Sequence, residues 1–333
     1  MSGDRPVAWA FVGASSFARS TMVGAVREAG GEVRRVVSSS AERSRTFAED
    51  AGIPGWGDDL DEALADRGVD AVYVSTTNDR HAPVTLAAAD AGKHVLCEKP
   101  LAMTLEDARS MKEACDAAGV VLATNHHLRN ATTHRTVRRL IEEGAVGEVL
   151  AARSFHAIAL PEHLRTWRVS SPAGGGVVLD ITVHDTDVLR FLLGRDVVEV
   201  VAMTPAPGNG VEHAVMGVLR FEGDVLASFH NAFDIPHAGT GIEIHGTLGS
   251  IIGRDVMARS PAVEVLLRRG FESIAVDTGP EENMYVRALR AFHGAVRGEG
   301  APAVTGEDGI KSLAVALAVL ESAQTGRAVR VAA

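Results

Sequence analysis

The stretch that decides the fold is VAWAFVGASSFARSTMVGAVREA, at residues 7–29. Its apolar beginning, VAWAFV, predicts a short buried strand that ends at Gly13. Residues 17–29, rich in Ala, Met and Val, predict a helix soon after this glycine. A strand, a tight turn and a helix in this order begin a βαβ unit, the building block of a parallel sheet.

The same alternation continues through the first part of the chain. Short apolar runs alternate with longer helical patterns, and this order predicts a parallel sheet with helices on both faces. Residues 1–126 are therefore expected to form a doubly wound, Rossmann-type domain. We expect further strands at 32–37, 70–76, 94–98 and 120–125 and helices at 41–51, 81–91 and 104–118, the last capped by Thr104.

The pattern changes after residue 126. Helices are expected at 129–143 and 180–193, with a strand at 148–157 between them, and the chain closes with helices at 282–298 and 307–325. Strands follow one another directly in between, at 197–204, 212–221, 225–233, 240–246 and 262–268, separated by turn signals. Residues 127–333 are thus expected to form an α+β domain with a large open, mostly antiparallel sheet. Helix 307–325 is a candidate to pack back on the first domain.

The composition limits the classes of protein. Apolar residues make up 46% and charged residues 23% of 333 residues, which is typical of a globular protein of two domains. The net charge of −10 argues against nucleic acid as a partner, because phosphate backbones require clustered Lys and Arg. No apolar run is long enough to span a membrane, and the N-terminus lacks the layout of a signal peptide. We therefore expect a cytoplasmic protein in which Cys97 and Cys115 are thiols.

The glycine turn indicates a dinucleotide cofactor. It reads Gly13-Ala14-Ser15-Ser16-Phe17-Ala18, where the usual fingerprint has glycine at the first, third and sixth positions. Only Gly13 is kept. Ser15 and Ala18 are still small enough for a pyrophosphate to approach the helix N-terminus.

The end of the second strand selects between the two nicotinamide cofactors. NAD-selective sites place an acidic residue there to bind the ribose hydroxyls. Here the segment reads Ser38-Ser39-Ser40-Ala41-Glu42-Arg43, with no acid at the strand end. Ser38 and Arg43 can instead donate hydrogen bonds to a 2′-phosphate. We predict a preference for NADP(H), with NAD(H) as the alternative; a helix-capping serine beside a surface arginine is the structural alternative.

Two further groups suggest chemistry. Lys99 follows the strand at 94–98, at the sheet edge where ligands of doubly wound sheets bind, and its ammonium can polarise a carbonyl. Asp180 and His184 are four residues apart on one helix face, as an acid–base pair requires, after the run Gly174-Gly175-Gly176. Such glycines allow a ligand close to the backbone. Taken singly, a surface Lys–Glu pair and ordinary helix-surface contacts explain these residues as well.

Together these segments resemble the Gfo/Idh/MocA family of oxidoreductases over essentially the whole chain. The matching stretches are STTNDRH at 75–81, AGKHVLCEKPLAMTLEDA at 91–108, GGGVVLDITVHDTDVLRFLLG at 174–194 and GEDGIKSLAVALAVLESAQTG at 306–326. GASSFA, SSSAER, TNHHLRNATTHR at 124–135 and TWR at 166–168 are most similar to members that reduce 1,5-anhydro-D-fructose to 1,5-anhydro-D-mannitol with NADPH.

The resemblance implies a role for each matching residue. Lys99, Asp180 and His184 would form the catalytic group, with His184 as the proton donor. The cofactor would be bound by residues of the glycine turn, the strand ends and three aromatic or basic side chains: Gly13, Ala14, Ser15, Ser16, Phe17, Ala18, Ser38, Ser39, Arg43, Thr76, Asn78, His81, Glu98, Lys99, Asn125, Trp167, Arg168 and Tyr285. The family also often has a cis peptide before the proline that here is Pro100.

Thirteen histidines raise the question of a metal. Neither an HExxH motif nor a Cys-rich spacing is present, and His126 and His127 are adjacent rather than one helical turn apart. We expect no metal. We interpret His126, His127, His156 and His163 as polar linings of a sugar pocket or as core groups.

Two other functions remain open at this point. One is a dehydrogenase of another sugar or polyol, such as an inositol or a glucoside. The other is a non-catalytic protein that senses the dinucleotide, although a sensor needs no acid–base pair. A small-molecule sugar is the expected partner, and the C-terminal sheet offers a face for a homo-oligomer.

Overall fold

The computed structural model describes residues 5–205, 210–257 and 263–332. The chain forms two compact units. The first consists of Met1–Asn130 and Glu282–Ile310, and the second of Ala131–Glu281 and Lys311–Ala333. The segment 282–310 therefore belongs to the same unit as the N-terminal sheet.

A six-stranded sheet forms the centre of the first unit. All its pairings are parallel, and the strand order is β3-β2-β1-β4-β5-β6. The direction of the order reverses between β1 and β4, and ligands of doubly wound sheets bind at this point. The predicted Rossmann sheet is confirmed. Its strands are β1 (Ala8–Val12), β2 (Glu32–Val37), β3 (Gly55–Gly57), β4 (Ala71–Val74), β5 (His94–Cys97) and β6 (Leu122–Thr124).

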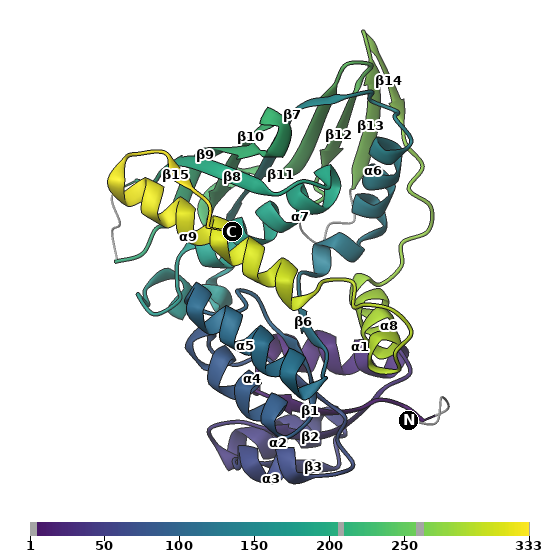
Figure 1. Cartoon of the computed structure of the whole chain (residues 1–333), viewed down its shortest axis with the longest axis vertical. Coiled ribbons are helices and arrows are strands. Elements are labelled where there is room, and N and C mark those ends of the chain that lie inside the picture. Colours follow the sequence, from purple (N-terminus) through teal and green to yellow (C-terminus); the bar gives the residue numbers. More distant parts are fainter. Residues whose placement is uncertain (1–4, 206–209, 258–262, 333) are drawn as a thin grey trace. The chain divides into compact units, whose positions relative to one another are not determined.

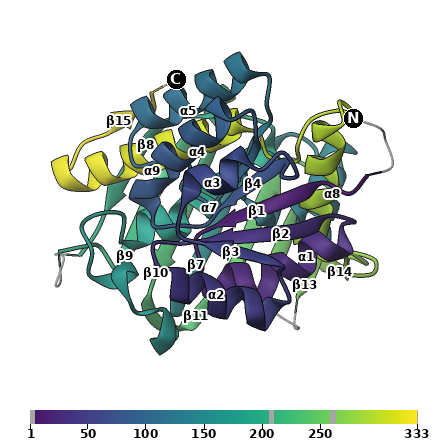
Figure 2. The same ribbon diagram turned by 90° about the horizontal axis from the view of Figure 1, so that it is seen from below.

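Helices cover both faces of this sheet (Figure 2). The helix predicted at 17–29 begins as a π-helical turn, η1 (Ala18–Met22), and continues as α1 (Val23–Glu28). Thr104 caps α5 as predicted, because its hydroxyl accepts from the Asp107 N–H at 3.1 Å. The other helices are α2 (Ala41–Ala51), α3 (Leu60–Ala65), η2 (Asn78–Arg80), α4 (His81–Asp90), α5 (Leu105–Ala118), η3 (His127–Asn130) and α8 (Met284–Val296).

The segment that returns from the far part of the chain completes the core of the first unit. Leu289 and Phe292 of α8 are buried in the same apolar cluster as Trp9 and Phe11 of β1. The Trp9 and Phe292 rings lie 4.9 Å apart. The Trp9 indole also donates to His293 Nε2 at 3.1 Å, which satisfies a buried polar group on each side.

A nine-stranded sheet forms the second unit, in the order β14-β13-β12-β11-β7-β10-β9-β8-β15. The pair β7 and β10 is parallel, whereas the other pairings recorded between its strands are antiparallel, as predicted. The strands are β7 (Val149–Ala159), β8 (Val197–Met203), β9 (Ala214–Phe221), β10 (Leu226–Ala232), β11 (Asp234–Gly246), β12 (Ser250–Arg254), β13 (Glu264–Arg269), β14 (Glu272–Ala275) and β15 (Val329–Arg330). Of these, β12, β14 and β15 were not predicted.

One face of this sheet is covered by helices α6 and α7 (Figure 1). Residues of the outer strands alternate accordingly, so that Val200 and Leu219 are buried while Val201 and Val218 are exposed. The remaining elements are α6 (Thr132–Glu142), η4 (Glu162–Leu164), η5 (Trp167–Val169), η6 (Val178–Thr182), α7 (Val183–Leu193), η7 (Glu222–Asp224) and α9 (Gly306–Thr325). Among the residues that the structure describes, no helix combines the length and the hydropathy of a membrane span.

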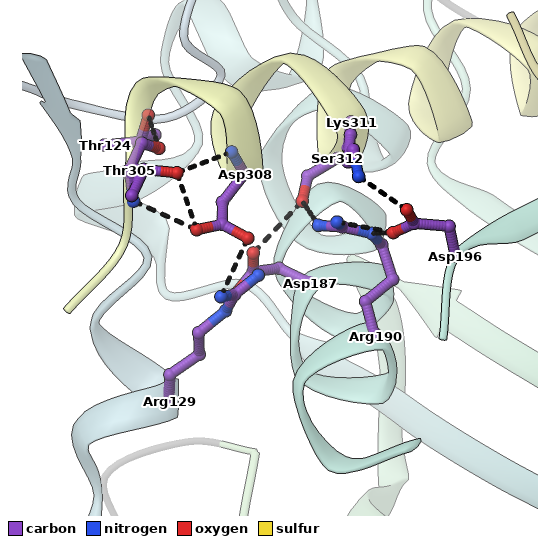
Figure 3. A network of polar contacts seen from close by, with 9 residues as sticks. All are labelled: Thr124, Arg129, Asp187, Arg190, Asp196, Thr305, Asp308, Lys311 and Ser312. Atoms are coloured by element: carbon purple, nitrogen blue, oxygen red, sulfur yellow. Dashed lines mark hydrogen bonds and ion pairs between the residues drawn. The ribbon is translucent and has the colours of Figure 1, made fainter. Parts of the chain in front are cut away.

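Helix α9 begins in the first unit and continues in the second, with polar contacts in each (Figure 3). In the first unit, Asp308 lies 3.0 Å from Arg129 and caps the helix together with Thr305. In the second, Lys311 donates to Asp196 at 2.6 Å and the Ser312 hydroxyl donates to Asp187 at 3.1 Å.

Candidate active site

The turn after β1 has the shape that a dinucleotide phosphate needs. Gly13 has a φ of +106°, and a Cβ at this position would lie 2.5 Å from the Ser75 carbonyl oxygen. Only glycine therefore fits between the ends of β1 and β4. The Ser15 hydroxyl accepts from the Ala18 N–H at 3.0 Å and lies 3.1 Å from the Ser75 hydroxyl. Ala14, Ser15 and Ser16 lead into the helix, whose N-cap is Phe17, and these small side chains allow an anion to approach its partly positive N-terminus.

The end of β2 brings an arginine to a serine. Arg43 Nη2 donates to the Ser39 hydroxyl at 2.5 Å; Arg43 lies in the first turn of α2, and Ser39 lies just before the Ser40 cap of that helix. The Ser38 hydroxyl is instead bonded to the Ser40 carbonyl at 3.0 Å and lies 2.8 Å from the Ser44 hydroxyl. These contacts favour Ser39, rather than Ser38, as the serine that acts with Arg43.

The carboxyl ends of β4, β5 and β6 carry a buried polar group. Glu98 Oε1 accepts from the Tyr73 hydroxyl at 2.6 Å and from Asn125 Nδ2 at 2.6 Å. Burial raises the pKa of Glu98, whereas these two hydrogen bonds and the nearby Lys99 oppose that rise. Glu98, Lys99 and Asn125 were predicted for the site; Tyr73 was not, and its only sequence signal is a hydroxyl in an otherwise apolar strand.

A buried histidine, His81, supports the loop that carries Lys99. The Lys99–Pro100 peptide is cis, as the resemblance implied. His81 is fully buried, and its Nδ1 lies 2.9 Å from the Pro100 carbonyl oxygen. Burial lowers the pKa of His81, so that a neutral imidazole supports this loop. Asn78 is also buried, and the Thr76 hydroxyl donates to the Thr77 carbonyl at 3.1 Å.

Tyr285 lies beside the glycine turn. Its ring is 5.5 Å from the Phe17 ring, edge to face, and 4.8 Å from the imidazole of His127. The structure thus brings together Phe17 and Tyr285, two predicted cofactor residues that are far apart in the sequence.

The second unit holds Asp180 and His184 around a helical irregularity. Asp180 lies in the π-helical turn η6, and His184 lies in the first turn of α7. Such π-turns often occur at functional sites. Asp180 Oδ2 is 3.4 Å from the Arg168 guanidinium, which stacks over the Trp167 ring at 4.8 Å. Trp167, Arg168 and Asp180 therefore form one polar cluster, as three of the predicted residues.

The glycine run has a different neighbour from the one that we expected. A Cβ on Gly175 would lie 2.5 Å from the Ser171 carbonyl oxygen and 2.7 Å from that of Trp167. A Cβ on Gly176 would meet the carboxylate of Glu212, which accepts from the Val178 N–H at 3.1 Å. These two glycines thus allow the chain to approach itself closely, and the helix start is occupied by Glu212 rather than open to a ligand.

A second acid of the same helix was not predicted to act. Asp185 is fully buried; its Oδ2 accepts from Asn231 Nδ2 at 2.6 Å, and its Oδ1 lies 3.5 Å from His156 Nδ1. No sequence motif connects these three residues, because they come from α7, β10 and β7. Lys99 belongs to the first unit and Asp180 and His184 to the second, so their convergence on one reacting carbon stays a prediction.

Comparison with known families agrees with both units. Residues 7–126 match the oxidoreductase family with an NAD-binding Rossmann fold, and residues 134–252 match the GFO/IDH/MocA C-terminal domain.

Several characterised proteins are similar along their whole length. A 1,5-anhydro-D-fructose reductase from Ensifer adhaerens is 53% identical over 97% of this chain and 98% of its own. A myo-inositol 2-dehydrogenase from Thermotoga maritima is 30% identical over 87% of this chain and 88% of its own. The crystal structure of an aldose-aldose oxidoreductase from Caulobacter crescentus, complexed with glycerol, is 27% identical with a TM-score of 0.90, and the match covers 98% of this chain and 100% of that one.

Proposed function

Because this chain belongs to the Gfo/Idh/MocA family of oxidoreductases, we propose that it is an NADPH-dependent reductase of a cyclic sugar ketone. The substrate of this proposal is 1,5-anhydro-D-fructose, and the product is 1,5-anhydro-D-mannitol. The observation that carries it is the identity of 53% with a reductase of that name over nearly the whole of both chains.

The residues of the first unit fit a phosphorylated dinucleotide. Gly13 lets the backbone turn at the helix start, where Ala14, Ser15, Ser16, Phe17 and Ala18 would surround the pyrophosphate. Ser39 and Arg43 would bind the 2′-phosphate, and this pair supports NADP(H) over NAD(H). Glu98, Asn125, Thr76 and Asn78 would border the ribose and the nicotinamide, and Trp167, Arg168 and Tyr285 would close over them.

The proposed chemistry uses three side chains. The bound cofactor supplies a hydride from C4 of its nicotinamide. Lys99 donates a hydrogen bond to the C2 carbonyl oxygen of the sugar and stabilises the negative charge that develops there. His184 gives that oxygen a proton, and Asp180 orients the imidazole for the transfer. Arg168, whose guanidinium lies 3.4 Å from Asp180 Oδ2, holds this carboxylate in place.

Two wider features belong to the same proposal. The exposed apolar side chains on the outer strands of the second unit, among them Met203, Met216 and Val218, support a homo-oligomer through this sheet. The two cysteines, which are free and buried, suit a reducing, cytoplasmic compartment.

The test is a panel of ketoses and polyols assayed by NADPH and NADH absorbance in both directions. The proposal expects the highest kcat/KM with 1,5-anhydro-D-fructose and NADPH. A higher value with an inositol or a glucoside would replace the substrate of the proposal by that compound.

The same panel is run with His184→Ala, and with His237→Ala as the control, since His237 is exposed on β11 and belongs to no proposed site. Turnover should fall by about 100-fold or more in the first variant, with the dissociation constant of NADPH nearly unchanged. The control should retain wild-type turnover. An unchanged turnover number in His184→Ala would remove this histidine from the reaction.

A further inference from the structure

Three adjacent strands of the first unit end in a single hydrogen-bonded group. Tyr73 lies on β4, Glu98 follows β5 and Asn125 follows β6. Tyr73 and Asn125 donate to the same oxygen, Glu98 Oε1, each at 2.6 Å. Because β5 lies between β4 and β6, the carboxylate is held from both sides.

Packing does not account for the hydroxyl of Tyr73. The ring is fully buried, and it packs edge to face on Phe11 with 4.9 Å between centroids. The rest of the strand is Ala71, Val72 and Val74, so a phenylalanine would fill the same space. Burial, and next the charge of Glu98, raise the pKa of Tyr73, so the phenol stays protonated and donates a hydrogen bond to the carboxylate.

Glu98 is partly buried, and a carboxylate withdrawn from water tends to take up a proton unless donors stabilise its charge. Burial raises the pKa of Glu98, and the hydrogen bonds from Tyr73 and Asn125 and the charge of Lys99 lower it. The other titratable groups of this cluster are the Cys97 thiol, which interacts with Glu98, and Tyr285 of α8, which interacts with Tyr73. Tyr73 thus contributes a hydrogen bond that only the ionised form of Glu98 receives in full.

We infer that Tyr73 is a positioning residue of the cofactor half-site: it holds Glu98 as an oriented carboxylate that accepts hydrogen bonds from the hydroxyls of the nicotinamide ribose. The inference rests on the proposed function in one respect, the place of Glu98 beside that ribose. According to this inference, Tyr73 influences how cofactor affinity changes with pH. A residue that only fills space in the core would have no such influence.

The experiment compares Tyr73→Phe with the wild type. The dissociation constant of NADP⁺, which is stable in mild acid, is measured by isothermal titration calorimetry as a function of pH without any sugar. In both proteins the affinity should decrease as the pH falls through the pKa of Glu98. In the variant this midpoint should lie about one pH unit higher, because a hydrogen bond to a charged acceptor is missing. The 2′-phosphate titrates in both proteins, so its effect cancels in the comparison.

Two controls separate positioning from stability. Val26→Ala truncates a buried residue of α1 in the same apolar cluster and should lower Tm while keeping the wild-type midpoint. Glu98→Gln should remove the decrease in NADP⁺ affinity whose midpoint shifts in Tyr73→Phe, because the glutamine does not titrate.

Two results would overturn the inference. One is an unchanged midpoint in Tyr73→Phe, and the other is a persistent midpoint in Glu98→Gln. Because no sugar is present, a failure of the proposed substrate leaves this measurement valid.

Discussion

At the end of β2, one side-chain contact underlies the proposed choice between two cofactors that differ by a phosphate. Arg43 and Ser39 are already in contact at 2.5 Å, and the Ser40 side chain caps the helix that carries Arg43. A guanidinium held in this way would lose less conformational freedom on binding a phosphate than a free one. The pair is therefore the residue-scale basis for the proposed preference for NADP(H).

Replacing this arginine gives a direct test. Arg43→Ala should lower kcat/KM for NADPH by about tenfold or more, because a charge-assisted hydrogen bond to the 2′-phosphate is lost, and should leave kcat/KM for NADH nearly unchanged. Arg45→Ala on the same helix, where Arg45 lies 4.0 Å from Glu49, is the matched control and should affect neither value. Equal losses with both cofactors in Arg43→Ala would speak against binding of the 2′-phosphate by this residue.

Single residues could be predicted from the sequence where the backbone alone determines them. Gly13 is one such case, because a strand followed closely by a helix requires a sharp turn. The run at Gly174–Gly176 shows the limit. The sequence shows that something lies close to these glycines, but not that it is the chain's own carbonyl groups and Glu212. Tyr73 was missed for the same reason, since its partner Glu98 is distant in the sequence.

At the scale of elements, helix α8 packs against the first sheet although it lies more than 150 residues after that sheet in the sequence. Its His293 joins two other elements, because Nε2 accepts from Trp9 of β1 at 3.1 Å and Nδ1 lies 3.2 Å from the Ala29 carbonyl oxygen at the end of α1. This arrangement requires a neutral ring with its proton on Nδ1. Protonation of Nε2 would break the bond with the indole and place a charge in the core.

The pH dependence of stability follows from this ring. Burial lowers the pKa of His293 from 6.5 to about 4. Between these values the unfolded chain binds a proton that the folded chain does not, so the stability that this residue contributes is complete above pH 6.5 and decreases as the pH falls toward 4. His293→Gln should therefore show a smaller fall of Tm across this range than the wild type, measured by circular dichroism. Parallel curves for the two proteins would contradict the assignment.

Most elements of the first unit could be predicted with accurate bounds, β2 and α2 residue by residue. Their signals are local, namely an apolar run, a capping serine and a terminal glycine. The missed strands β3, β14 and β15 lie at the edges of their sheets, and the missed strand β12 is interrupted by Gly253. Such strands are stabilised by the neighbouring strand more than by their own residues, so the sequence pattern is weak.

At the scale of the whole molecule, the uncovered face of the nine-stranded sheet carries apolar residues in register. Val201 pairs with Val218, and Met203 pairs with Met216, so exposed side chains of β8 and β9 lie next to one another. Farther along the sheet the same face carries the ion pair Arg153–Glu243. An apolar area beside charged pairs is typical of an interface between copies of one chain.

This surface predicts an oligomer that one charge can dissociate. The wild type should form a dimer or a larger assembly in multi-angle light scattering, and Met216→Lys should shift it toward the monomer, because the new charge would have to be buried without a partner. Phe271→Lys is the control, since Phe271 is fully exposed in the turn between β13 and β14. A monomeric wild type, or an assembly that Met216→Lys leaves intact, would refute the prediction.

Residues 282–310 belong to the first unit, and this determines where the chain can be truncated or recombined. An expression fragment that stops at the first boundary would lack Leu289 and Phe292, and the exposed cluster around Trp9 would favour aggregation. The second unit is in effect an insertion into the first, and its last segment, Lys311–Ala333, follows the segment that returns to the first unit. A chimera that exchanges the second unit while keeping the first therefore needs three junctions, after residues 130, 281 and 310, instead of a single crossover.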